Sequence, residues 1–235
     1  MITHRVKGPY EAFIKRVLDI VVSAFVMILF SWLYIALAIL VGVKLGRPVL
    51  FKQERPGKID PKTGKEKLFR LYKFRSMTDK RDEKGHLLPD TQRLTTFGAK
   101  LRETSLDELP ELINIFRGDM SFVGPRPLAI VYLPYYTQAE RARHLVRPGL
   151  TGLAQVNGRN SLTWEEKFAF DTEYVNNITF LTDLKIIFLT IKTVLKHEGI
   201  SQGHNSPGSF HTYRQKQMRA EKIEPAREVD GCDDN

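Results

Sequence analysis

Two adjacent carboxylates, Asp107 and Glu108, stand in the stretch SLDELPELINIF between Ser105 and Phe116. A carboxylate can attack a phosphoryl centre and form an acyl-phosphate intermediate. Because such an attack brings two anions together, it requires cations. Mg²⁺ held by a few carboxylates and by substrate phosphates would supply them. Phosphoryl transfer is therefore one candidate chemistry for this stretch.

The same stretch can also be interpreted as the start of a helix. Ser105 followed three residues later by Glu108 is the signature of a capping box, in which the acids merely complement the helix dipole. Pro110 conflicts with a start at Ser105, because it would be an interior helical residue without an N–H to donate. A start at Pro110 instead leaves Asp107 and Glu108 in a turn ahead of the helix, where free N–H groups favour anions.

Arginines that could meet a phosphate lie on both sides of this stretch. Arg102 comes five residues before Asp107, and Arg126 stands between two prolines that restrict the backbone. Arg147 and Arg159 lie in a segment rich in glycine. Taken alone, an arginine of this kind is more often a surface residue in an ion pair. The chain has no Walker A loop, no strand followed by G-x-G-x-x-G and no G-x-S-x-G motif, so three common catalytic frameworks are missing.

The whole chain has the composition of a folded protein with an anionic partner. It has 235 residues, 42% of them hydrophobic, and a formal net charge of +9. This excludes a wholly disordered chain, and the charge points to phosphates, nucleic acid or an anionic membrane. Most of the basic excess lies between Lys44 and Arg102. The single cysteine, Cys232, excludes a disulfide framework.

An uncharged run from Ile20 to Val43 predicts a membrane helix. As a helix of about 1.5 Å rise per residue it would be roughly 36 Å long, enough to cross a bilayer core of about 30 Å. A signal peptide is the alternative, but the run is too long and continues past its only candidate cleavage site. Basic residues flank both ends, so the positive-inside rule favours a hairpin that returns to the same side over a plain span. Ser31 is the polar residue that could bend it, by bonding back to the Met27 carbonyl.

The rest of the chain predicts a mainly helical α+β domain. Residues 49–53 and 68–74 are expected to be strands of a short hairpin around a loop over 54–67. A polar loop is expected over 78–93, ordered Gly/Pro loops are expected over 118–128 and 147–160, and helices over 94–104, 164–177 and 180–199. The last helix is amphipathic, and its apolar face predicts a core helix slightly ahead of a membrane-surface helix. After about residue 203 the polar tail is expected to be disordered.

Six segments in order resemble the bacterial sugar transferase family, the monotopic polyprenyl-phosphate phosphoglycosyl transferases. They are KRVLDIVVS, FKQERPG, YKFRSM, TSLDELPELINIF, GDMSFVGPRP and RPGLTGLAQVNGRN, and together they cover roughly residues 14–200. The chain is most similar to the small single-domain members, including the enzyme that initiates bacterial N-linked glycan assembly. The resemblance implies three parts: a re-entrant membrane helix over 1–46, a cytoplasmic catalytic domain over 47–202 and a tail over 203–235.

The resemblance also implies a reaction and its residues. A phosphosugar passes from a UDP-sugar to undecaprenyl phosphate, with release of UMP, by way of a covalent intermediate on Asp107. Glu108 matches the nucleophile's partner and the contact to Mg²⁺. The family's nucleotide motif and its further polar site positions match Pro125, Arg126, Pro127, Lys73, Arg102, Arg147, Arg159 and Asp171. Relatives often break the membrane helix with Ser-Pro; here the pair is Ser31-Trp32, which leaves the cause of the bend open.

The implied location is the inner membrane of a bacterium, with the catalytic domain on the cytoplasmic face. The implied partners are the two substrates, membrane phospholipid and downstream glycosyltransferases, with a homodimer left open. Two other function classes compete: a non-catalytic membrane module that binds lipid or a partner, and a nucleic-acid binder, which has no recognition motif here. Within the enzyme class, one-step transfer with Asp107 as general base is the alternative. Nothing in the sequence identifies the sugar.

Overall fold

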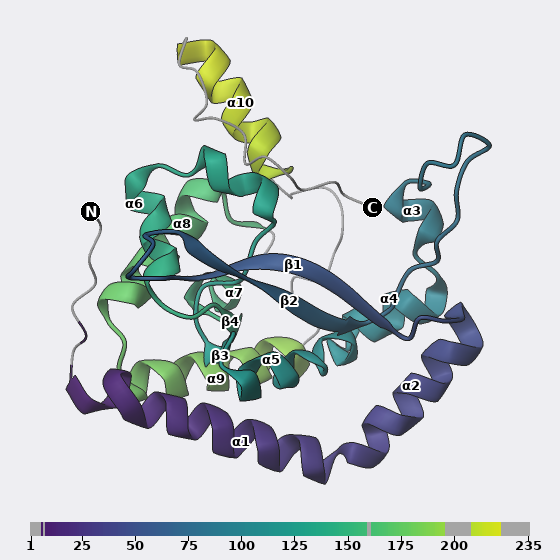
Figure 1. The fold of residues 1–235 in the computed structure, drawn as a ribbon, viewed down its shortest axis with the longest axis horizontal. Coiled ribbons are helices and arrows are strands. Elements are labelled where there is room, and N and C mark those ends of the chain that lie inside the picture. Colours follow the sequence, from purple (N-terminus) through teal and green to yellow (C-terminus); the bar gives the residue numbers. More distant parts are fainter. Residues whose placement is uncertain (1–5, 7, 159–160, 196–207, 222–235) are drawn as a thin grey trace.

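The computed structural model describes residue 6 and residues 8–158, 161–195 and 208–221. A long twisted hairpin lies across the middle of the molecule, α1 and α2 run along one side, and α10 projects from the opposite side (Figure 1). The strands are β1 (Leu50–Ile59), β2 (Glu66–Phe74), β3 (Ser121–Val123) and β4 (Gly149–Thr151). The α-helices are α1 (Lys15–Leu29), α2 (Ser31–Leu45), α3 (Asp90–Arg93), α4 (Thr96–Glu103), α5 (Glu111–Arg117), α6 (Gln138–Arg141), α7 (Leu153–Val156), α8 (Trp164–Asn176), α9 (Phe180–Leu195) and α10 (Phe210–Glu221). Shorter helical turns are η1 (Tyr10–Ile14), η2 (Leu106–Glu108), η3 (Ile130–Tyr135) and η4 (Ala142–Leu145).

The N-terminal helices form one bent apolar unit. Tyr10–Leu29 and Ser31–Leu45 meet at an angle of 66°, and together they have the length and composition of a broken membrane span or a re-entrant hairpin. Within the described residues, no helix is long and apolar enough to span a membrane by itself. The bend falls at Phe30, next to the predicted Ser31-Trp32 pair.

The predicted cause of the bend is wrong. Across the described residues the Ser31 hydroxyl makes no hydrogen bond, so it does not bond back to the Met27 carbonyl. The tie to the domain comes from the next turn, where the Tyr34 hydroxyl donates to the Leu109 carbonyl at 2.7 Å. A contact across 75 residues of sequence could not be read from the local pattern. It fixes α2 directly to the turn that carries the two acids.

The polarity of α1 is reversed relative to a helix on a water-soluble protein. Its side chains buried against the domain are Asp19 and Ser23. Asp19 accepts hydrogen bonds from the Ser121 hydroxyl and the Phe122 amide, both at 3.1 Å. Its outward face is apolar, and the exposed large side chains include Val17, Leu18, Val21, Val22, Phe25, Ile28 and Leu29. Polar groups inside and apolar groups outside suit a lipid environment.

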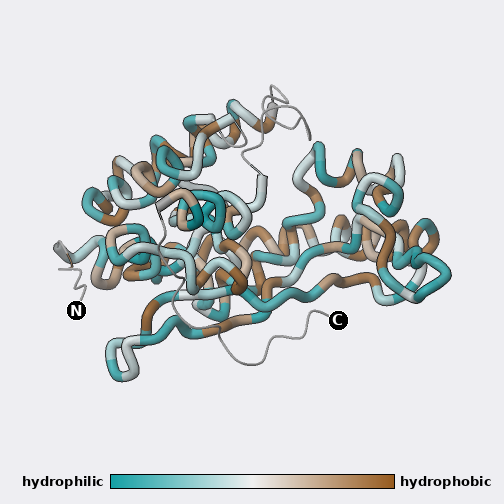
Figure 2. Tube along the Cα trace, turned by 90° about the horizontal axis from the view of Figure 1, so that it is seen from above, coloured by the Kyte–Doolittle hydropathy of each residue, from teal (hydrophilic) through white to brown (hydrophobic). Residues whose placement is uncertain are grey.

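The hairpin is longer than the sequence predicted. β1 pairs with β2 antiparallel from Leu50↔Phe74 to Pro56↔Leu68, and after a register irregularity again at Ile59↔Glu66. The expected loop over 54–67 is therefore wrong except near its tip, which Figure 2 shows as hydrophilic. Proline has no N–H for the ladder and is tolerated where a strand pairing is irregular, which allows β1 to continue past Pro56.

Two segments that were expected to be glycine-rich loops contain short strands that pair in parallel, and this close pairing is called the β3–β4 crossing below. β3 pairs with β4 through Ser121↔Gly149 and Val123↔Thr151. A Cβ on Gly149 would lie 2.1 Å from the Gly124 nitrogen, so only glycine permits this approach. This pairing matters for the site because it fixes the backbone just before Arg126.

The apolar face of α9 is largely exposed. Leu184 is 51% exposed, Phe188 67% and Ile191 54%, whereas Ile186 is buried. The slight preference for a core helix is therefore wrong, because the domain covers only the opposite side of this helix. Its exposed face adds to the apolar surface of α1 and α2 and suits a membrane-surface helix.

The expectation of a disordered tail fails for residues 208–221. These residues include α10, and the side chain of Phe210 is completely buried. The Phe210 ring lies 5.0 Å from Phe168, 5.2 Å from Trp164 and 5.3 Å from Tyr136, measured between ring centroids. One aromatic anchor in a polar segment is too weak a sequence signal to predict this docking, yet it buries a large apolar area.

Replacing Phe210 with alanine should release α10 from the domain. Loss of the buried ring should weaken the docking by roughly 3 kcal/mol. Hydrogen exchange should then accelerate across α10 but not across the hairpin. Lys216→Ala, at an exposed position of the same helix, serves as the control and should leave exchange unchanged. Unaltered protection of α10 in Phe210→Ala would contradict the anchoring role.

Candidate active site

The turn that carries the two acids is shaped by Ser105 and Pro110. Ser105 adopts a left-handed conformation (φ 56°) and makes no side-chain cap bond, so the capping-box interpretation is wrong. Pro110 is the N-cap of α5, which begins at Glu111. This confirms that Asp107 and Glu108 lie in a turn just ahead of a helix. The turn is η2 (Leu106–Glu108), which ends three residues before α5 begins at Glu111.

Asp107 is a buried carboxylate without a protein partner. It is 7% exposed, lines the main pocket and makes no hydrogen bond or ion pair with the described residues. Burial, and then the negative charge of Glu108, raise the pKa of the Asp107 carboxyl to about 6. A carboxylate that is neither solvated nor paired retains its electron pairs for a reacting atom.

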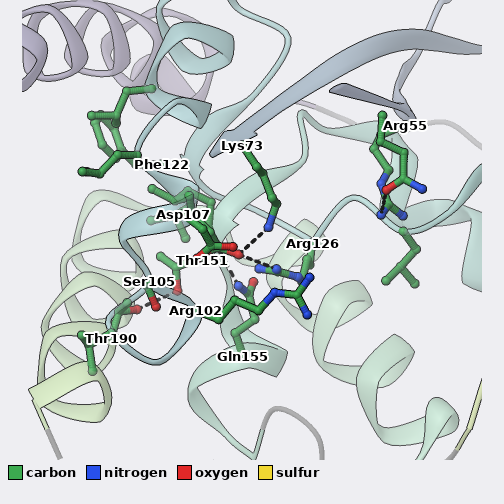
Figure 3. Close-up of a pocket in the computed structure, with 18 of the residues that line it drawn as sticks. Arg55, Lys73, Arg102, Ser105, Asp107, Phe122, Arg126, Thr151, Gln155 and Thr190 are labelled. Atoms are coloured by element: carbon green, nitrogen blue, oxygen red, sulfur yellow. Dashed lines mark hydrogen bonds and ion pairs between the residues drawn. The ribbon is translucent and has the colours of Figure 1, made fainter. Parts of the chain in front are cut away.

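Glu108 has the opposite environment. Its Oε1 atom accepts hydrogen bonds from Lys73 Nζ at 2.7 Å and from Arg126 Nη2 at 2.6 Å (Figure 3). Burial opposes ionisation, but the charges of Arg126 and Lys73 outweigh it and hold the pKa of Glu108 well below its usual range. The two adjacent acids therefore lose their protons in different pH ranges, Glu108 well below its usual pKa and Asp107 near pH 6. This difference is the arrangement expected when neighbouring carboxylates have separate roles.

Glu111 is a third acid that the sequence analysis did not single out. Its carboxylate lies 3.1 Å from Lys73 Nζ and is almost fully buried. Burial, and then the charge of Glu108, raise the pKa of Glu111 above its usual range. Its position three residues after Glu108, in the first turn of α5, is the signal that could have revealed it, because residues at this spacing share a helix face.

Two predicted arginines reach the pocket from different elements. Arg102, in the last turn of α4, donates from Nε to the Ser76 hydroxyl at 2.8 Å. Arg126 follows the crossing of β3 and β4 and points toward the acids together with Lys73 (Figure 3). The positive charges of Lys73, Arg102 and Arg126 all favour ionisation of Asp107, which places the three cations around it.

The loop of Arg126 is held by a buried ion pair. Arg143 donates from Nη2 to the Arg126 carbonyl at 2.6 Å and from Nε to the Asp171 carboxylate at 2.9 Å. Asp171 thus acts on Arg126 through Arg143, a residue missed from the sequence. Pro125 and Pro127 are buried, and the Pro125 carbonyl accepts from the Gly149 amide at 2.9 Å. All four residues immobilise the backbone that presents Arg126.

One predicted site residue, Arg147, is not brought to this pocket, and another cannot be placed. Arg147 donates from Nε to the Gly118 carbonyl at 3.0 Å and lines a separate small depression with Lys58. Arg159 lies outside the described residues. The site formed by the described residues therefore contains Asp107 and Glu108 with Lys73, Arg102 and Arg126, supported by Pro125, Pro127 and Asp171.

The pocket extends well beyond the acids and has a volume of about 1810 Å³. One part is apolar and reaches α1 and α9, where its lining includes Val22, Val26, Leu184, Ile187 and Ile191. The other part is polar and aromatic, with Arg55, Tyr132, Trp164 and Lys167. Arg55 was not singled out from the sequence. Its guanidinium donates to Gln53 at 2.5 Å and has no acidic partner in the described part of the chain, so it can meet an anion.

The acids fit a magnesium ion only if the substrate supplies most of its ligands. Within the described residues, no group of three or more His, Cys, Asp or Glu side chains could hold a metal ion. Mg²⁺ commonly binds one or two carboxylates together with water and substrate phosphates. Asp107, which pairs with none of the described residues, and Glu108 offer the hard oxygen donors that this mode requires. The donor chemistry therefore fits.

Comparisons with known proteins identify the family of this chain. Residues 10–197 match the family model described as bacterial sugar transferase. An uncharacterized sugar transferase, EpsL, of Bacillus subtilis is 50% identical over 189 residues, which cover 80% of this chain and 91% of that protein. The chain belongs to the bacterial sugar transferase family.

Two further relatives are longer and carry names that state a reaction. The undecaprenyl-phosphate galactose phosphotransferase of Salmonella typhimurium is 38% identical over 204 residues, covering 80% of this chain and 41% of that protein. The UDP-glucose:undecaprenyl-phosphate glucose-1-phosphate transferase of Klebsiella pneumoniae is 40% identical over 187 residues, covering 75% of this chain and 39% of that protein. The chain thus spans well under half of the length of these two relatives.

Replacing Asp107 with asparagine should stabilise the protein at neutral pH. The folded state raises this pKa from 3.8 to about 6, so folding takes up a proton between those values and this group's contribution to stability falls as pH rises through them. Removing the charge should gain up to about 3 kcal/mol at pH 7.5 and less at pH 5. Thermal unfolding of the parent and the variant at pH 7.5 and pH 5 measures this difference in stability.

Glu108→Gln is the matched control with the opposite sign. It weakens the contacts to Lys73 and Arg126 and should lower stability at pH 7.5 by about 1–3 kcal/mol. Equal destabilisation by both substitutions would contradict the contrast between the paired and the unpaired acid.

Proposed function

We propose that this protein transfers a phosphosugar from a UDP-sugar to undecaprenyl phosphate and releases UMP, as an early membrane step of glycoconjugate assembly. The observation that carries the proposal is the unpaired, buried Asp107 carboxylate next to Glu108, which is bound to two cations. The family match and the named reactions of two relatives support the reaction class.

The donor's diphosphate fits the cationic part of the pocket. Lys73, Arg102 and Arg126 surround Asp107 and can neutralise phosphate oxygens, and arginine can do so through two parallel hydrogen bonds. Arg55 and the aromatic rings of Tyr132 and Trp164 extend the same cavity and suit the nucleotide. A bound Mg²⁺, with Glu108 as its contact, would add charge neutralisation at the diphosphate.

In the first step, an Asp107 carboxylate oxygen forms a bond to the β-phosphorus of the donor. The bond from that phosphorus to the bridging oxygen breaks, and its electron pair leaves with UMP. Because the pKa of Asp107 is about 6, most of this residue is ionised at pH 7 and no base is needed to activate it. Arg126 is positioned by Arg143 and stabilises the charge that grows on the phosphoryl oxygens.

In the second step, a phosphate oxygen of undecaprenyl phosphate attacks the same phosphorus. The bond to Asp107 breaks, the carboxylate is regenerated, and the product is a diphosphate-linked sugar. The apolar part of the cavity, between α1 and α9, offers a route for the acceptor's chain to the acids. The exposed apolar faces of α1, α2 and α9 suit a bacterial inner membrane, entered from the cytoplasmic side by a re-entrant helix pair.

The product would be the substrate of downstream glycosyltransferases. A homodimer stays a prediction.

Two-step transfer and one-step transfer with Asp107 as general base use the same residues, and they differ in whether the donor alone can react. We favour the two-step route because an unpaired carboxylate that faces the pocket has no proton to remove from a phosphate that is already ionised.

Purified protein in detergent or nanodiscs should release UMP from one member of a UDP-sugar panel when polyprenyl phosphate and Mg²⁺ are present. Asp107→Asn should lower the rate on the order of a thousandfold. Glu103→Gln, which removes an exposed acid four residues earlier, should leave the rate unchanged. If no UDP-sugar yields UMP with the parent protein, a non-catalytic lipid-binding or partner-binding module becomes the better account.

The re-entrant topology can be tested in intact cells. In a Cys232→Ser background, single cysteines placed at the N-terminus and at Lys52 should both resist a membrane-impermeant thiol reagent until the cells are permeabilised, because both ends of the bent pair should face the cytoplasm. A plain span predicts that the N-terminal cysteine alone reacts from outside, and that result would reject the hairpin.

A further inference from the structure

A group of cations lies away from the proposed catalytic pocket. Lys58 near the end of β1 and Arg147 just before β4 line a depression of about 50 Å³, and Arg16 of α1 lies beside it. We call these three residues the basic notch. None of them lines the cavity that contains Asp107. Arg147 was predicted to bind substrate, so its place here requires another explanation.

The notch is held together at Gly118. Arg147 donates from Nε to the Gly118 carbonyl at 3.0 Å, and a Cβ on Gly118 would lie 2.9 Å from Arg16 Nη2. Arg16 itself donates to the carbonyls of Ile115 and Phe116 at the end of α5. Gly118 has φ 90°, the left-handed conformation that glycine adopts readily at a helix C-terminus. Two guanidinium groups are thus fixed around one residue.

The charges of the notch are only partly compensated. Lys58 makes no hydrogen bond or ion pair with the described residues, and Arg147 bonds only to a neutral carbonyl among them. Glu11 lines the same depression, and Asp19 and Asp119 both lie near Arg16. Asp19 is itself bound by the Ser121 hydroxyl and the Phe122 amide, and the charge of Lys15 is matched by Asp183 at 2.5 Å. Burial, and then the charge of Arg147, lower the pKa of Lys58. Converging cations of this kind favour a bound anion.

Two exposed aromatic side chains lie close to Arg16 in the notch. Phe13 of η1, three residues before Arg16, is 69% exposed, and Phe116, whose carbonyl Arg16 binds, is 45% exposed. Cations next to exposed aromatic and aliphatic side chains match a molecule with a phosphate head and an acyl tail. A free phosphate or nucleotide would gain nothing from these apolar neighbours, which argues for a lipid.

We propose that the basic notch of Arg16, Lys58 and Arg147 binds the phosphodiester of an anionic phospholipid whose acyl chains lie along the outer face of α1. This lipid would be a structural partner, separate from the acceptor substrate. It would attach the loop before β4, and with it the β3–β4 crossing, to the membrane surface. The proposal does not depend on the catalytic reaction and can be tested by binding alone.

The test uses the full chain in phosphatidylcholine nanodiscs that contain a minor fraction of phosphatidylglycerol. Native mass spectrometry counts the phosphatidylglycerol retained on the released protein. The double variant Lys58→Gln/Arg147→Gln should lower the ratio of lipid-bound to lipid-free protein roughly 30-fold, if each basic residue contributes as much as it typically does at an anionic membrane surface. Arg147→Lys, which keeps the charge, should retain most of the binding.

Lys62→Gln/Lys65→Gln removes the same charge from exposed positions at the hairpin tip and is the matched control. It should bind phosphatidylglycerol like the parent. Equal loss in the control would overturn the site in favour of diffuse charge attraction, and full retention in the Lys58/Arg147 variant would overturn it outright. Displacement of the lipid by inorganic phosphate would overturn the lipid assignment, because it would show an anion site without lipid preference. Thermal unfolding of each variant shows whether a loss of lipid binding comes from misfolding. If the double variant misfolds, lipid binding by Arg147→Lys tests the site instead, and its loss in a folded protein would overturn the proposal.

Discussion

The double ion pair on Glu108 is the interaction on which the site depends. One carboxylate oxygen joins Lys73 of the hairpin, the turn before α5, and Arg126 of the loop after β3. These three segments are far apart in the sequence, and each is fixed by its own means. The hairpin is held by its ladder, the turn by Ser105 and Pro110, and the Arg126 loop by the glycine crossing and the Arg143–Asp171 pair. Glu108 brings these three supports together at one point.

This arrangement explains why adjacent acids behave differently. Glu108 takes two cations, so its charge is satisfied, and it then repels a second charge on Asp107 and on Glu111. Asp107 is left buried and unpaired among the described residues, and its pKa is raised to about 6. Such a group is costly to stability, because a buried carboxylate lacks solvation. A loss of folding stability of this kind is expected at a pocket where the reaction requires an unpaired carboxylate.

The sequence was most informative where signals were local. Short-range signals account for α8, for the described part of the helix predicted over 180–199 (α9, Phe180–Leu195), for the turn ahead of α5 and for the apolar N-terminal unit; residues 196–199 lie outside the described residues. It failed where a distant contact decided the outcome. The docking of Phe210, the extension of β1 past Pro56 and the Tyr34 tie are invisible without the tertiary partner. Arg126 and Arg147 both lie in Gly/Pro segments, and only the fold shows that the first faces the acids and the second does not.

The central claim is that the Asp107 carboxylate is itself the nucleophile, set apart by the pairing of its neighbour. The most direct measurement mixes the protein with a cognate UDP-sugar and Mg²⁺ without any lipid acceptor and follows intact mass and UMP together. The account predicts a burst of UMP that does not exceed the amount of enzyme, a mass increase equal to one phosphosugar, and an adduct that maps to Asp107. UMP release that requires the acceptor, with no adduct at any time, would contradict it.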